Sequence, residues 1–407
     1  MSTTRFGEAS KATINVAIDQ VTPINTKRSN GYVWKQFHEF CGQRGYELTR
    51  TTPTTKLALI MKDWGYNMKQ KNGEDYKESV IKTMWNVTAK QLQKLYFQEF
   101  GVRFDPFSDV EFKQSRAARD AKRRELQKLP EKRKCSSSAL SDAEYKDIVS
   151  KLDEDTPDGL ERKFYYIASY ELAWRGGEAA VAEVNFFQDE VSNSGVWSGR
   201  IEYNPVFSKT AQGGGRKLAD SKWLVANREK SEFCPVRLFK KLLSKIGPNV
   251  TTNRLFLTPN PLWKDPSSVG WYKSSPVGKN QIGKWTKSDA KQIGVDTTIT
   301  KITNHSLRSS AVSHLARGGV GEEQLIKITG HASTASIKPY LQLDSCHHAK
   351  IIGKMRNEAS SSTYSSTLIT SSSSSSSSTN LEKECDVSAK KPRIMNFYNC
   401  TFHSNQF

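Results

Sequence analysis

The chain has 407 residues, which is enough for two domains or for one large domain with tails. Its 61 Lys and Arg residues outnumber its 42 Asp and Glu residues, and the resulting formal net charge of +19 indicates a polyanionic partner. No stretch approaches the roughly 18 consecutive apolar residues of a transmembrane helix, and the six scattered cysteines exclude a small disulfide framework.

The scattered cysteines also indicate a protein of a reducing compartment. Residues 1–27 are polar and lack the apolar core of a signal peptide, and we expect them to form a flexible arm. From Val33 to Phe100 apolar residues recur at spacings of three and four, and glycines such as Gly65 and Gly101 end the apolar stripes. This pattern predicts a unit of four helices over residues 28–112. We interpret its Trp and Phe residues as core rather than as platforms for stacking bases.

Residues 113–138 are expected to form a basic linker. Between Lys113 and Lys134 there are ten Lys and Arg residues and only three acidic residues. Pro130 interrupts any helix there, and three serines follow at 136–138. The stretch is either a solvated charged helix or a strap that lies on DNA phosphates, and such a cluster also resembles a nuclear-import signal. The candidate DNA-binding residues are Lys122, Arg123, Arg124, Lys132, Arg133 and Lys134.

A second, larger domain is predicted over residues 139–356. We expect helices over 142–152, 161–175, 234–246, 277–293 and 306–317, and strands over 200–207 and 222–225. The fold class is therefore mostly α with a small β-sheet (α+β). Residues 357–407 contain eight consecutive serines at 371–378 and a second basic cluster at 390–393, so this tail is expected to be disordered.

The densest chemical signal lies between Asn304 and Tyr340. His305 and Arg308 are three residues apart in the first turn of a predicted helix, where free N–H groups and the helix dipole suit a phosphate. Gly330 and His331 end the next short helix, and Tyr340 follows nine residues later. Each residue alone has a structural explanation, so the interpretation depends on their joint spacing.

This ordered set resembles the C-terminal signature of the tyrosine recombinases, also called the phage integrase family. That family carries, further upstream, an arginine followed three residues later by an acid, which Arg175 and Glu178 match. It also carries a lysine on a β-hairpin. Lys209 best fits that position, although Lys217 and Lys222 lie near the same hairpin. The resemblance covers roughly residues 139–355, and the helical unit before it is similar in size and place to the family's core-binding domain.

The resemblance implies DNA cleavage without metal, ATP or any other cofactor. Tyr340 would attack phosphorus and form a 3′-phosphotyrosine, and His305 would accept the phenol proton. The two arginines would stabilise the charge that develops on the phosphate, Lys209 would protonate the leaving 5′-oxygen, and Glu178 would brace Arg175. The implied catalytic residues are Arg175, Lys209, His305, Arg308, His331 and Tyr340.

Two residues depart from the family's pattern. Trp174 stands before Arg175, where small turn residues are common, and Pro339 stands directly before Tyr340. Proline fixes its own φ angle, so Pro339 either positions the nucleophile or holds it away from the site.

The Cys346–His348 run and the pair Cys400 and His403 lack the partners of a structural zinc site.

Within the family, the segment around Cys234–Arg237 and the pair Trp271 and Tyr272 resemble the Crypton group of mobile elements. The resemblance implies a nuclear protein that acts as a homotetramer on two DNA duplexes. One alternative is a domesticated, non-catalytic DNA-binding protein derived from such an element. A type IB topoisomerase, which uses the same tyrosine chemistry, is a third interpretation.

Overall fold

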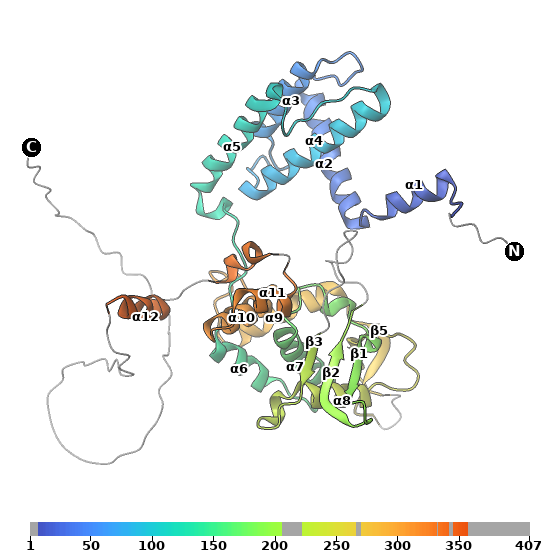
Figure 1. The fold of residues 1–407 in the computed structure, drawn as a ribbon, viewed down its shortest axis with the longest axis vertical. Coiled ribbons are helices and arrows are strands. Elements are labelled where there is room, and N and C mark those ends of the chain that lie inside the picture. The colour runs from blue at the N-terminus through green and yellow to red at the C-terminus, as the bar shows by residue number, and fades with distance from the viewer. Residues whose placement is uncertain (1–6, 206–221, 266–269, 332, 342–344, 357–407) are drawn as a thin grey trace, which may run out of the picture. The chain divides into compact units, whose positions relative to one another are not determined.

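The computed structural model describes residues 7–205, 222–265, 270–331, 333–341 and 345–356. These residues are mostly helical and include two small antiparallel sheets, which confirms the predicted fold class (Figure 1). Their buried apolar side chains form two separate cores, one within residues 33–126 and one within residues 140–307. None of the described helices is long and apolar enough to cross a membrane.

The first core belongs to a helical unit. It contains α2 (Ile24–Arg44), α3 (Thr54–Asn67), α4 (Glu78–Phe100) and α5 (Lys113–Gln127), and a fully exposed helix, α1 (Lys11–Gln20), precedes them where a flexible arm was expected. Trp64, Trp85 and Phe37 are buried, so these aromatic residues belong to the core as predicted. The last two of the four predicted helices, with apolar residues at 80–87 and 92–100, are one continuous helix, α4, because its buried residues stay on a single face from Ile81 to Tyr96.

Helix α5 occupies most of the stretch expected to be a linker. It packs on α3 and α4, where Leu126 is fully buried and the Ser115 hydroxyl donates a hydrogen bond of 2.6 Å to the Ala58 carbonyl. Only Ser115, Lys122 and Leu126 of its residues are buried. Because most of the other residues of α5 are charged, its apolar signal was too weak to reveal the packing.

The second core belongs to a mixed α and β unit. Its helices are α6 (Asp142–Lys151), α7 (Pro157–Glu171), α8 (Pro235–Ser244), α9 (Lys279–Gln292), α10 (His305–Arg317) and α11 (Glu322–Thr329). Its strands are β1 (Phe187–Val191), β2 (Trp197–Tyr203), β3 (Lys222–Val225), β4 (Leu257–Pro259) and β5 (Tyr272–Pro276). The five predicted helices are present, whereas β1, β4 and β5 were not predicted. Helix α12 (Ser345–Met355) belongs to a separate unit that begins at Asp344.

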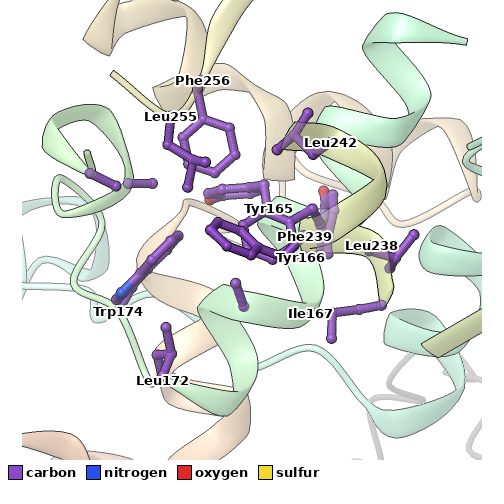
Figure 2. Packing of buried hydrophobic residues seen from close by; sticks show 14 of the residues in the cluster. Tyr165, Tyr166, Ile167, Leu172, Trp174, Leu238, Phe239, Leu242, Leu255 and Phe256 are labelled. Carbon is purple, nitrogen blue, oxygen red and sulfur yellow. The ribbon is translucent and has the colours of Figure 1, made fainter. Parts of the chain in front are cut away.

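The three-stranded sheet has the order β1-β2-β3, and all its pairs are antiparallel. Along β2 the residues alternate, so that Ile201 and Tyr203 are buried while Arg200 is exposed. Figure 2 shows how the core packs around α7, with Tyr165 and Tyr166 near Phe239 and Phe256. This packing fixes the C-terminal end of α7, which leads directly into the candidate site.

The chain leaves α7 through a left-handed turn. Ala173 has a φ of 47° and is the non-glycine residue with positive φ in the described part of the chain. The Trp174 amide donates to the Ser169 carbonyl at 3.1 Å, which is the hydrogen bond that closes a Schellman-type helix end. The carbonyl groups of Leu172 and Ala173 are thereby available to side chains from elsewhere.

Candidate active site

Tyr340 and His305 contact each other through their side chains. The Tyr340 hydroxyl lies 2.6 Å from His305 Nε2, and the two ring centroids are 5.6 Å apart. His305 is the first residue of α10, and Tyr340 ends a short 3₁₀ turn (Lys338–Tyr340) that contains Pro339. The fixed φ angle of Pro339 is compatible with this turn, so proline does not prevent the contact.

Arg308 is the most deeply buried charge at this site. Its side chain is about as inaccessible as the core residues, at 1% exposure, and one terminal nitrogen donates to the Ala173 carbonyl. Burial and the nearby charge of Arg175 lower the Arg308 pKa to about 10, so the guanidinium stays charged at neutral pH. Its Nε is buried and has no hydrogen-bond partner in the described chain, so this donor is unsatisfied in the protein without DNA.

His331 is held as a neutral imidazole. Burial, followed by the charges of Arg308 and Arg175, lowers its pKa to about 3. Its Nδ1 lies 2.6 Å from the Thr329 hydroxyl, which itself donates to the Leu325 carbonyl. Nδ1 is therefore the protonated nitrogen, and Nε2 is the acceptor that faces Arg308, one terminal nitrogen of which lies 3.2 Å from Nε2 and 3.3 Å from Nδ1.

Arg175 is fixed by a carboxylate and a carbonyl. Its guanidinium donates to Glu178 Oε1 at 2.8 Å and to the Gly330 carbonyl at 2.6 Å. The other oxygen of Glu178 accepts a hydrogen bond from the Arg175 backbone amide at 2.9 Å. The carboxylate therefore binds both the backbone and the side chain of Arg175. This geometry gives Glu178 the bracing contact that the resemblance implies.

Of the three lysines near the predicted hairpin, the structure describes Lys222. Lys209 lies outside the described residues, whereas Lys222 begins β3 and donates to the Leu172 carbonyl at 2.5 Å. Burial lowers the Lys222 pKa to about 8, and the charges of Arg308 and Arg175 add to this effect against the opposing charge of Glu178. Lys222 therefore shares the electrostatic environment of both arginines.

The site combines a neutral base with an excess of positive charge. Burial and the two arginines lower the His305 pKa below its usual value of 6.5, so His305 is neutral at pH 7 and able to accept a proton. Among the described residues, the carboxylate of Glu178 offsets only part of the positive charge of Arg175, Arg308 and Lys222. No group of three or more His, Cys, Asp and Glu residues that could hold a metal ion occurs in the described segments. The arrangement suits a phosphate that reacts with the Tyr340 hydroxyl.

Five of the six predicted catalytic residues are thus brought together by α10, by the ends of α7 and α11, and by the 3₁₀ turn. Sequence reasoning missed the carbonyl groups of Leu172 and Ala173 and the hydroxyl of Thr329. Backbone acceptors leave no trace in residue type. Thr329 stands two residues before His331, but a threonine at that spacing is too common to be a signal.

The predicted DNA-binding residues divide into paired and exposed side chains. Lys122 is buried and contacts the carboxylates of Asp75 and Glu125, both at 3.2 Å. Arg123 pairs with acidic residues, and Lys132 contacts Glu74 and the Asp75 carbonyl. Three of the six predicted side chains are exposed, and these remain the stronger candidates for phosphate contacts: Arg124, Arg133 and Lys134.

We expect Lys122→Ala and Arg124→Ala to separate stability from DNA affinity. Lys122→Ala leaves the part-buried Asp75 without its partner and should lower the free energy of unfolding by about 1–3 kcal/mol in urea titrations. Arg124→Ala should leave stability unchanged and reduce the slope of log affinity against log salt by about one. Equal stability of the two variants would show that α5 does not depend on the Lys122 contacts.

The sequence matches no family model, and no curated protein is similar to it in sequence. Solved structures do resemble it. The XerH site-specific recombinase, bound to its palindromic difH substrate in a post-cleavage complex, has a TM-score of 0.50 and 15% identity, over 79% of this chain and 77% of XerH. A lambda integrase dimer bound to a COC′ core site has a TM-score of 0.47 and 12% identity, over 81% of this chain and 95% of that one. The likeness to XerH, at this identity, shows that the chain has a tyrosine-recombinase-like fold.

Proposed function

We propose that the chain is a site-specific DNA recombinase that cleaves and rejoins DNA strands through a 3′-phosphotyrosine at Tyr340. The observation that carries the proposal is the contact of 2.6 Å between the Tyr340 hydroxyl and His305 Nε2, beside two arginines. The recombinase-like fold and the net charge of +19 support the same conclusion independently.

The cleavage step uses a neutral base and a phenol. His305 Nε2 accepts the phenol proton while the Tyr340 oxygen forms a bond to phosphorus and the bond from phosphorus to the 5′-oxygen breaks. Because burial and the arginines keep His305 neutral, the base is ready at physiological pH. The phosphotyrosine conserves the energy of the phosphodiester, so a 5′-hydroxyl from a second strand reverses the step without ATP.

The cations stabilise the charge that develops during this step. Arg175 and Arg308 are held by the protein before DNA binds, so little reorganisation is needed when the phosphate becomes more negative. Neutral His331 supports Arg308 through Nε2. We propose Lys222 as the donor of the proton to the leaving 5′-oxygen, with Lys209 as the alternative from sequence.

The pH dependence of cleavage distinguishes the two lysines. Cleavage at limiting DNA should fall on the acid side as His305 gains a proton, below the usual histidine pKa of 6.5. It should fall on the alkaline side near pH 8, where Lys222 loses its proton. Lys222→Arg should move the alkaline limb to higher pH in single-turnover assays. An alkaline limb that stays in place in this variant would point to Lys209.

The partners and origin follow from the same proposal. Double-stranded DNA is the substrate, and we propose that four copies of the protein act on two duplexes. We further propose that a Crypton-like mobile element encodes the protein and that the protein acts in the nucleus. The support is the resemblance of Cys234–Arg237 and Trp271 to that group, and two basic clusters of the kind that direct nuclear import.

A covalent-trapping assay tests the proposal. DNA sites selected by the protein from a random-sequence library are converted to nicked duplexes that release the cleaved end, and the products are separated on denaturing gels. The proposal expects a protein–DNA adduct with the wild type and none with Tyr340→Phe, which preserves the ring and removes the nucleophile. Native-gel binding of the selected DNA without any adduct would instead identify a non-catalytic DNA-binding protein.

A further inference from the structure

Tyr340 is held at two points by one helix. At the N-terminus of α10, His305 contacts its hydroxyl at 2.6 Å, and two turns later the Ser313 hydroxyl donates to its backbone carbonyl at 2.7 Å. Ser313 is buried, with 8% exposure. The Tyr340 amide meanwhile donates to the Ile337 carbonyl, and Ile337 is fully buried.

The Ser313 hydrogen bond is not the one that a serine inside a helix ordinarily makes. Such a serine usually donates to the carbonyl four residues earlier, as Ser310 does to Ser306 at 2.9 Å. The hydrogen bond that the structure shows for Ser313 leaves its helix and crosses to the segment that carries Tyr340. Helix propensity does not favour serine over alanine, and the contact with Tyr340 is one that alanine could not make.

We propose that Ser313 is a positioning residue, which holds the main chain of Tyr340 against α10 so that the hydroxyl stays at His305. A side chain with several rotatable bonds reaches one point reliably only when its backbone is fixed. Ser313 fixes the backbone, and His305 contacts the other end. The catalytic meaning of this contact rests on the proposed function, but the contact itself is a property of the protein without DNA.

Hydrogen exchange of the DNA-free protein, read by mass spectrometry, tests the contact alone. Ser313→Ala should accelerate exchange of the Tyr340 and Leu341 amides, which donate to Ile337 and Lys338 in the 3₁₀ turn. Ser309→Ala is the matched control. Ser309 is buried on the same helix four residues earlier, and its hydroxyl lies 3.5 Å from the Ser137 carbonyl rather than near Tyr340.

Single-turnover cleavage then tests the catalytic consequence. Ser313→Ala should slow cleavage about 5- to 10-fold, the range expected for one lost hydrogen bond, while DNA affinity stays at the wild-type value. Ser313→Thr retains the hydroxyl and should restore the rate and the slow exchange. Thermal melting of each variant identifies any that fails to fold, and Ser309→Ala should match the wild type in both assays.

The outcomes separate this inference from the proposed function. Unchanged exchange in a folded Ser313→Ala protein overturns the inference, and so does faster exchange with an unchanged cleavage rate. Faster exchange together with slower cleavage supports it. If the wild type forms no adduct with any DNA, the proposed function fails, and the exchange comparison alone decides whether Ser313 holds the Tyr340 segment.

Discussion

Replacing Arg308 with alanine is expected to slow single-turnover DNA cleavage by about 10²–10³-fold or more, the usual effect of removing one preorganised donor from a developing negative charge. Arg308 is buried at 1% exposure, its Nε has no partner within the described residues, and its terminal nitrogens are already oriented by Ala173 and His331. The phosphate would lose a donor that needs no reorganisation. The measurement is the adduct formed against time at saturating DNA.

Two further variants test whether the slower cleavage is specific to the guanidinium of Arg308. Arg308→Lys should recover little activity, because an ammonium does not reproduce the planar, divergent donors that reach Ala173, His331 and the phosphate together. Arg317→Ala removes an exposed arginine from the last turn of the same helix and should leave the rate unchanged. An Arg308→Ala protein that folds and cleaves at the wild-type rate would exclude Arg308 from the reaction.

The second large effect is expected for Trp174→Ala. Trp174 is 1% exposed and packs against Phe187, Tyr203 and Phe256. Figure 2 shows it among the buried residues of the second core. Removing a buried indole leaves a cavity and should lower the free energy of unfolding by about 3–5 kcal/mol. Cleavage should also slow, because Trp174 anchors the turn that leads into Arg175.

Urea unfolding of Trp174→Ala and Trp197→Ala provides the comparison. Trp197 is 43% exposed on β2, with Lys240 over its ring, so its removal should cost less than about 1 kcal/mol. Equal losses in the two variants would mean that Trp174 does not anchor the turn. Trp174 stands where tyrosine recombinases commonly have a small residue. Its burial in the core explains this difference.

The sequence predicted those parts of the site whose residue types are chemically distinctive. His305 and Arg308 stand three residues apart, which places them on one helical turn, and the resemblance to the tyrosine recombinases added Tyr340 to the site. The apolar period of three and four likewise predicted the helices of both units, because burial on one face leaves a regular trace. The helices follow from residue type and spacing alone, whereas the site residues also needed the resemblance to a known family.

The remainder depends on contacts that residue types do not encode. The left-handed turn at Ala173 has no glycine to mark it, although it orients the carbonyls that hold Arg308 and Lys222. Helix α5 was assigned to a linker because its three buried residues are hidden among charges. Lys222 is a secondary candidate from sequence, because its burial, its lowered pKa and its contact with the Leu172 carbonyl arise only in the folded protein.

The most direct test of the central claim is to identify the residue that becomes attached to DNA. Adduct trapped on a nicked duplex is digested with nuclease and protease, and the nucleotidyl peptide is sequenced by tandem mass spectrometry. The account predicts a nucleotide joined through its 3′-phosphate to Tyr340. Attachment to another residue, or a free 3′-phosphate with no linked peptide, would contradict it.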